Sequence, residues 1–186
     1  MRYVHLTVIL FMLAFTAGVF TCVNPAGAAT AEEIDRDARS ALEQLYLKSP
    51  SAKALGEKAS GILVFPRIVK GGFIVGGQFG EGALFKDGST AGYYNTVQLS
   101  YGLQAGVQKY GYALFFMSES AMSWLDKSAG WELGVGPSIV VVDIGAAGAA
   151  ATTTTLQAQI YAFFFSQKGL MAGLGLQGTK VTKIDK

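Results

Sequence analysis

Cysteine and histidine are almost absent from this sequence, where Cys22 and His5 are the single examples of each. Both precede residue 29, in a segment that we expect to be removed from the mature chain. The remaining sequence therefore has no thiol for a disulfide bond or a nucleophile, and no imidazole for a zinc site or a Ser-His-Asp triad. These absences exclude zinc sites of the Cys/His type and cysteine- or histidine-dependent hydrolases.

Charge is sparse as well. Charged residues make up 15% of the 186 residues, and 15 Lys and Arg against 13 Asp and Glu leave a net charge of +2. Proteins that bind nucleic acid generally carry a dense basic face, so we expect no nucleic-acid partner. Hydrophobic residues make up 51%, which excludes general disorder and is sufficient for one domain with its own core.

The first 28 residues have the pattern of a secretory signal peptide. Arg2 precedes an apolar stretch over residues 6–23, and small residues follow up to Ala28, after which we expect cleavage. A retained membrane anchor and lipidation at Cys22 are the alternatives. An exported domain without disulfide bonds relies on packing alone, which suits a bacterial periplasm better than a harsher extracellular setting. The expected location is therefore periplasmic, either free or peripherally attached to a membrane.

Two helices are predicted next. Thr30 and Glu33 fit a capping box, and apolar residues at helical spacing predict an amphipathic helix over 30–48, within an N-terminal segment 29–50. Ser49-Pro50 ends this helix, and a second, short helix is predicted over 51–60.

From residue 61 onward the hydrophobic period changes to two, which predicts strands. Asp87-Gly88 lies between apolar runs and indicates a hairpin. Single strands are predicted over 97–107, 110–117, 131–142, 154–165, 170–176 and 179–184, with a short helix over 118–126. We expect an α+β fold, in which two N-terminal helices precede about eight mostly antiparallel strands forming a curved sheet, a sandwich or a small barrel.

Glycine pairs recur inside the strand patterns, at Gly102 and Gly106, Gly134 and Gly136, and Gly173 and Gly175. Each pair is expected on one face of its strand. The curvature of a closing sheet explains such glycines, and so does a shallow apolar trough that accepts an acyl chain. Both interpretations remain open from the sequence.

No motif predicts catalysis. The glycines over 71–77 are not followed by Lys-Ser/Thr, so they form no phosphate-binding loop. The acidic residues that might pair are far apart in sequence and lack metal-ligand spacing, namely Glu81, Asp126, Glu132 and Asp143. We therefore expect no enzymatic activity, no cofactor and no metal site.

The basic residues give a stronger indication of function than the acidic residues or the glycine motifs do. Lys53, Lys58, Arg67 and Lys70 lie within residues 53–70, where Glu57 is the single acid. A basic cluster beside an amphipathic helix can bind anionic lipid headgroups, at about 1 kcal/mol per cation. A solvated rim on an ordinary fold is the alternative.

Six short segments, in order and at matching intervals, resemble the SYLF domain family from about residue 52 to residue 184. They are KASGILVFP at 58–66, KGGFIVGG at 70–77, GYYN at 92–95, GLQAG at 102–106, GVGP at 134–137 and SQKGLMAG at 166–173. The resemblance implies a lipid-binding domain without enzymatic activity; eukaryotic members bind phosphoinositides, and some are described as actin-binding modules. It implies Lys58, Lys70 and Lys168 as matched cations. GYYN departs from the family, where many members have Gly-Trp-Ser.

We therefore expect a non-enzymatic, exported protein whose SYLF-like domain spans residues 51–186. Its partner would be anionic phospholipid, a phosphoinositide-type headgroup or a lipid membrane surface. The expected contacts are an apolar surface and five cations: Lys53, Lys58, Arg67, Lys70 and Lys168. A periplasmic protein-interaction or envelope scaffold with an unknown protein partner is the alternative, and actin binding rests on family analogy alone. A small outer-membrane barrel and an enzyme rank below these.

Overall fold

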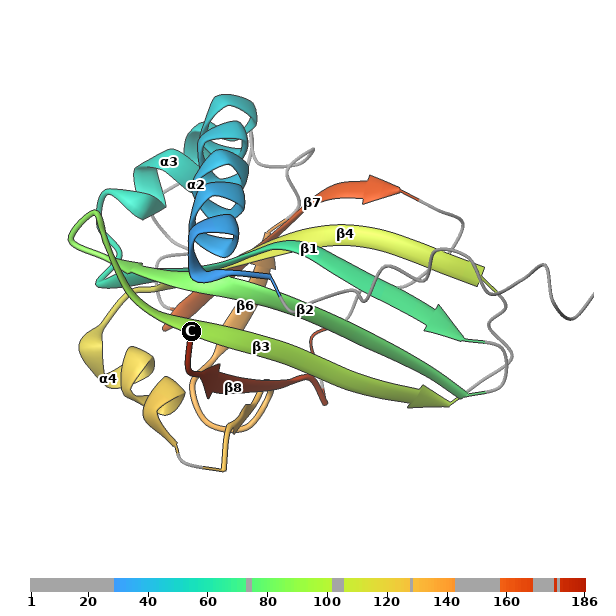
Figure 1. Cartoon of the computed structure of the whole chain (residues 1–186). Helices are drawn as coiled ribbons and strands as arrows, with labels where there is room; N and C mark the ends of the chain where they lie inside the picture. The colour runs from blue at the N-terminus through green and yellow to red at the C-terminus, as the bar shows by residue number, and fades with distance from the viewer. Residues whose placement is uncertain are drawn as a thin grey trace, which may run out of the picture.

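The computed structural model describes residues 29–72, 75–101, 106–127, 129–142, 158–168, 176 and 178–186. Figure 1 shows helices on both sides of one long curved sheet. The predicted signal peptide, glycines 102, 173 and 175, and most of the strand predicted over 170–176 lie outside the described residues.

The first described helix, α2, spans Ala31–Lys48 and forms as predicted. The Glu33 backbone N–H donates to Thr30 Oγ1 at 3.2 Å, and the Thr30 N–H donates to Glu33 Oε2 at 2.9 Å. This reciprocal capping box satisfies two N–H groups that the start of a helix otherwise leaves unpaired. The buried stripe of α2 consists of Ile34, Ala38 and Leu45.

The second helix, α3, spans Pro50–Gly56 and is shorter than predicted. Ser49 ends α2 and also caps α3, because its Oγ accepts the Ala52 N–H at 3.2 Å. Pro50 occupies the first turn of α3, where its missing N–H removes no helical hydrogen bond. The pair Ser49-Pro50 therefore ends one helix and starts the next.

The remaining elements form one eight-stranded sheet with the order β5-β8-β3-β2-β1-β4-β7-β6. All of the paired strands are antiparallel except β6 and β7. The strands are β1 (Gly61–Gly72), β2 (Val75–Lys86), β3 (Ser89–Tyr101), β4 (Gly106–Phe116), β5 (Trp131–Glu132), β6 (Ile139–Val142), β7 (Ile160–Lys168) and β8 (Lys180–Ile184). A short helix, α4 (Glu119–Met122), and a 3-10 turn (Ser123–Asp126) follow β4. The α+β fold with a curved sheet is confirmed.

Two local features fix the register of the first strands. The predicted hairpin joins β2 to β3, with positive φ at Asp87 (50°) and Gly88 (77°), as a two-residue type I′ turn requires. A bulge in β1 lies between Phe65 and Ile68, at Pro66, where the missing proline N–H is tolerated. Beyond this bulge the odd-numbered residues of β1 face the same side as α2.

Two strands predicted as single are each divided into two. Residues 97–107 contribute to β3, which ends at Tyr101, and to β4, which begins at Gly106 on the other side of the β1–β2 pair. Gly106 has a φ of 148°, which favours glycine. The apolar alternation is the same before and after the connection, so the period alone did not reveal the break.

The strand predicted over 131–142 is likewise wrong as a single element. Its ends are β5 and β6, which form opposite edges of the sheet. Gly134 (φ 100°) and Gly136 (φ 98°) lie between them in conformations that other residues rarely adopt. These two glycines therefore allow the backbone to change direction between β5 and β6, and they do not lie on the face of a strand.

Each side of the sheet carries its own core. On the helix side, α2 and α3 pack on Ile62, Val64, Phe85, Phe115 and Phe163. On the other side, the Trp131 ring of β5 lies 6.0 Å from the Phe116 ring of β4, although four strands separate β5 from β4 in the sheet. The sheet therefore curls around this second core like a half-barrel, and we call this the inner side.

Candidate functional site

The helix side of the sheet is only partly covered by the described helices. β1, β2 and β3 run well past α2 (Figure 1). Five large apolar side chains are exposed on this uncovered part, with fractions up to 68% for Leu99: Val69, Phe79, Val97, Leu99 and Val107. Single exposed apolar residues are ordinary, but a contiguous group marks an interaction surface. We call this group the exposed face.

The strand registers place part of the exposed face in one row across the sheet. Val69 of β1 lies opposite Phe79 of β2, which lies opposite Val97 of β3. Directly opposed residues in antiparallel strands point to the same side of the sheet. Across six neighbouring strands the complete row reads Lys180, Val97, Phe79, Val69, Lys109 and Lys168. This lysine-ended row has an apolar centre and cations at both ends.

The next row along the same strands is almost flat. Leu99 lies opposite Gly77, Gly77 opposite Gly71, and Gly71 opposite Val107. A Cβ atom added at Gly71 or Gly77 would meet its nearest neighbours at 3.8 Å or 3.6 Å, which is ordinary contact. Packing therefore does not demand these two glycines. In this row the two glycines leave only backbone between the exposed side chains of Leu99 and Val107.

The exposed face is positively charged along its borders. Lys109 and Lys168 are exposed and have no acidic partner among the described residues. Glu81, which lies on the same side, is neutralised by Lys186, with Nζ and Oε1 2.9 Å apart. Glu132 lies directly opposite Lys180 at the sheet edge.

The structure separates the five cations predicted from the sequence. Arg67, with its Nη2 3.9 Å from Asp37 of α2, and Lys168 lie on the helix side next to the exposed face. Lys53 on α3 and Lys58 before β1 are exposed at the other end of the molecule's helix side.

Lys70 is the exception, because it is 8% exposed and lies on the inner side. It is two residues from Ile68, which belongs to the inner core. Lipid contact by the five predicted residues remains a prediction, and the structure groups only two of them with the exposed face.

Sequence reasoning missed Lys109 and Lys180. Lys109 is the single charged residue between Asp87 and Glu119, and Lys180 is the first of three lysines within residues 180–186. Only the register places them in line with Val69 and Val97. The one available signal was the alternation of Val107 and Lys109, which puts a cation beside an apolar residue on one strand face.

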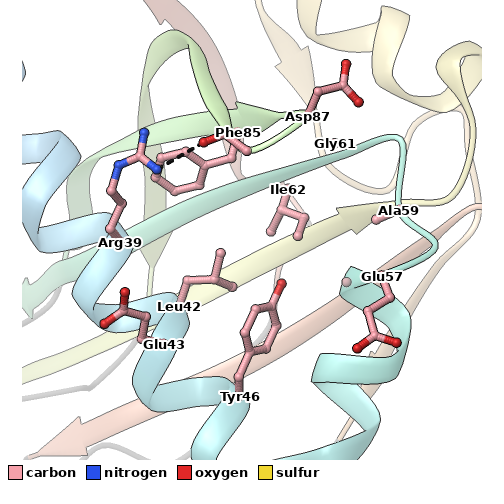
Figure 2. A pocket seen from close by; sticks show the side chains of 12 residues that line it. Arg39, Leu42, Glu43, Tyr46, Glu57, Ala59, Gly61, Ile62, Phe85 and Asp87 are labelled. Atoms are coloured by element: carbon pink, nitrogen blue, oxygen red, sulfur yellow. Dashed lines mark hydrogen bonds between the residues drawn. The ribbon is translucent and has the colours of Figure 1, made fainter.

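A cavity of about 440 Å³ lies elsewhere on the helix side, between α2, the start of β1 and the β2–β3 turn (Figure 2). Arg39 lies over the Phe85 ring, 4.7 Å from its centroid, and donates to Asp35 Oδ2 at 2.7 Å and to the Gly88 carbonyl at 3.1 Å. The hydrogen bond from Arg39 lowers the pKa of the Asp35 carboxyl. Arg39 therefore ties α2 to the hairpin and is not available to a ligand.

The rim of this cavity is acidic. Glu43, Glu57 and Asp87 line it, are exposed, and form no salt bridge with the described residues. Burial, with the nearby Glu57 charge as a second cause, raises the pKa of Tyr46 on the cavity wall. A surface of this charge repels anionic groups, so the cavity does not suit an anionic lipid headgroup.

Within the described ranges no helix has both the length and the apolar character needed to cross a bilayer. The same ranges contain no group of three or more His, Cys, Asp or Glu side chains able to hold a metal ion.

Comparison with known proteins agrees with the resemblance found in the sequence. Residues 97–186 match the model of the Ysc84 family, described as "Las17-binding protein actin regulator". No curated protein matches the chain. The matched segment includes β4, β7 and β8, and with them the three lysines of the lysine-ended row. Residues 97–186 therefore match the Ysc84 (SYLF) family, in agreement with the motifs of the sequence.

Proposed function

We propose that this protein is a non-enzymatic, exported domain that attaches to anionic membrane surfaces through the exposed face. The lysine-ended row carries the proposal, because it joins an apolar centre to cations at both ends of a single line across the sheet. Such a surface is complementary to a membrane interface, where anionic headgroups lie beside acyl chains.

The expected energies are sufficient for reversible attachment. Each lysine near an anionic surface contributes about 1 kcal/mol, and full burial of one large aliphatic or aromatic side chain contributes about 1.5–3 kcal/mol. The side chains stand on a packed sheet, so little backbone entropy is lost on binding. Leu99 and Val107, which lie opposite Gly77 and Gly71, are the most exposed members and would enter the interface first.

The N-terminal segment supports export of the chain. In a bacterial periplasm the anionic lipids available to the exposed face are phosphatidylglycerol, cardiolipin and lipid A. This location is part of the proposal and rests on the signal-peptide pattern of residues 1–28.

The family description favours a second candidate, a protein-interaction module. An apolar surface bordered by cations suits an acidic protein partner as well. The two candidates make different demands on the exposed face. A membrane can bind it without a specific surface shape, whereas a protein partner needs a complementary shape.

Co-sedimentation with vesicles tests the proposal. The full sequence is expressed, and the protein is purified in the form that the cell produces. It is then mixed with phosphatidylcholine vesicles that either contain or lack phosphatidylglycerol. We expect pelleting with the anionic vesicles only, reduced by salt because screening weakens the lysine contribution.

A pair of double variants identifies the surface. Lys109→Ala with Lys168→Ala removes two cations of the row, and Lys53→Ala with Lys58→Ala removes two cations far from it. We expect a large loss of pelleting from the first pair and a small one from the second. Equal losses would show that net charge acts without the exposed face, and unchanged pelleting in both would exclude the proposed surface.

A further inference from the structure

Buried polar side chains gather in one layer on the inner side of the half-barrel. Six polar residues are buried in the part of the chain that the structure describes. Ser49 is a helix cap, and the other five belong to this layer: Lys70, Gln78, Thr96, Gln108 and Thr179. The layer lies beside a core that is otherwise apolar and aromatic.

Part of the layer is a completed hydrogen-bond network. The Tyr110 hydroxyl donates to Gln78 Oε1, and Gln78 Nε2 donates to Thr179 Oγ1 at 3.3 Å. Thr96 Oγ1 and Tyr112 Oη are 2.8 Å apart. Burial raises the pKa of Tyr110 to about 12, so its phenol remains a donor at neutral pH. These contacts hold Gln78 in a single orientation.

The other part of the layer is incomplete. Lys70 lies directly opposite Gln78 on one neighbouring strand and Gln108 on the other, and the three side chains share the inner side. Lys70 forms no salt bridge or hydrogen bond with any residue that the structure describes. Gln108 is 3% exposed, and its Oε1 atom is buried without a hydrogen-bond partner. The layer thus contains a largely buried lysine without a counter-charge and a buried acceptor without a donor.

Such groups are unfavourable when they remain unpaired. Burying an ammonium group without a counter-charge is expensive, and an orphan carbonyl loses its hydration without compensation. An apolar side chain in place of Lys70 would avoid the first penalty, and one in place of Gln108 would avoid the second. Lys70 retains 8% exposure, so the side chain is not sealed from solvent.

We propose that Lys70 and Gln108 form a binding site for a phosphate group that carries a hydroxyl hydrogen. The phosphate oxygens accept hydrogen bonds from the Lys70 ammonium group, and a hydroxyl of the same ligand donates to Gln108 Oε1. A carboxylate would pair with Lys70 but has no hydrogen for Gln108. The shared chemistry is that of inorganic phosphate and of a phosphorylated polyol such as the headgroup of phosphatidylglycerol.

This site is independent of the exposed face. Val69 belongs to the exposed face and Lys70 to the inner side, on consecutive residues of the same strand. A ligand at one site therefore lies across the sheet from the other. The proposed membrane attachment can fail while phosphate binding holds, and the reverse is also true.

Titration calorimetry at constant ionic strength tests the site on the purified full-length product, with three probes: inorganic phosphate, glycerol 1-phosphate and sulfate. Sulfate is an anion without a hydroxyl hydrogen at neutral pH. We expect phosphate or glycerol 1-phosphate to bind at least tenfold more tightly than sulfate. A tenfold preference for glycerol 1-phosphate indicates a lipid headgroup, and equal affinity or a preference for inorganic phosphate indicates free phosphate.

Two variants locate the binding. Lys70→Met keeps the unbranched apolar stem and is expected to abolish binding, whereas Gln108→Leu is expected to remove the preference over sulfate. The double variant Lys53→Ala, Lys58→Ala, which removes two exposed cations far from both surfaces, is the matched control and should bind the probes as wild type does. The proposal would be overturned if Lys70→Met bound the phosphate probes as tightly as the wild type does. It would also be overturned if the wild type bound neither phosphate probe. If Lys70→Met does not fold, the phosphate-to-sulfate ratio of Gln108→Leu decides alone.

Discussion

Lys109 of β4 and Lys168 of β7 lie directly opposite each other in the sheet, and both are exposed. Like charges at directly opposed positions destabilise a pair of strands. The described residues supply no acid to relieve this repulsion. An external anion would relieve it, and the apolar row beside Lys109 is where a membrane would supply one.

The first prediction separates stability from binding at this pair. Replacing Lys168 with Glu turns the repulsion into an attraction, so we expect the free energy of unfolding to rise by about 0.2–1 kcal/mol. The same change removes one cation from the exposed face and adds an anion, so pelleting with anionic vesicles should fall. Urea unfolding and vesicle co-sedimentation measure the two effects.

Lys53→Glu is the control for that experiment. Lys53 is exposed on α3, away from the exposed face, and undergoes the same change of charge. We expect a much smaller loss of pelleting from this variant. A Lys168→Glu protein that pellets as well as wild type would argue against any role for the row.

The second prediction concerns the apolar part of the exposed face. Leu99 is 68% exposed, so Leu99→Gln should change the free energy of unfolding by no more than about 0.5 kcal/mol. It should nevertheless weaken vesicle binding, because the side chain no longer gains from entering the interface. Leu47→Gln is a matched control, since Leu47 is 86% exposed on α2. Equal effects of the two variants on pelleting would contradict a specific apolar contact.

Local signals in the sequence predicted the local structure well. The capping box at Thr30 and the hairpin at Asp87-Gly88 form where their residues indicate. The helix predicted over 118–126 forms as a four-residue α-helix followed by a 3-10 turn. Each of these features depends on side chains and backbone within a few positions, so neighbouring residues contain the necessary information.

The candidate site was less predictable because it depends on pairing between distant strands. Lys109 and Lys180 join the row only through the register of β4 with β1 and of β8 with β3. Lys70 and Arg67 are three residues apart in sequence, yet lie on opposite sides of the sheet, because side chains alternate along a regular strand and an odd separation reverses the side. A basic cluster in sequence is therefore not a cluster in space here.

The third prediction is a loss of stability at alkaline pH. Burial raises the pKa of Tyr94 and Tyr110 to about 12, and it also raises the pKa of Tyr112. An unfolded tyrosine ionises near pH 10, so the folded state retains protons that the unfolded state releases. This contribution to stability is complete below about pH 10 and is lost as pH rises to about 12.

Urea unfolding from about pH 9 to about pH 12 measures this loss. Tyr110→Phe removes one of the three phenols and should make the decline with pH shallower, although it also removes the hydrogen bond to Gln78. A decline of the same slope in the variant would show that other groups, such as lysines losing their charge, control alkaline unfolding.

The fourth prediction uses the orphan carbonyl of Gln108. Because Oε1 is buried without a partner, Gln108→Leu removes an unfavourable group of similar size and should stabilise the phosphate-free protein by about 1 kcal/mol. Urea unfolding in a phosphate-free buffer measures this gain. Gln78→Leu is the informative comparison, because Gln78 is equally buried but fully hydrogen-bonded, and its loss leaves the Tyr110 hydroxyl and Thr179 without their partner. We expect that variant to be destabilised by about 1–3 kcal/mol. Opposite signs at two glutamines that flank the same lysine would show that the layer is incomplete at Gln108 specifically, whereas destabilisation in both variants would mean that Gln108 already has the partner it needs.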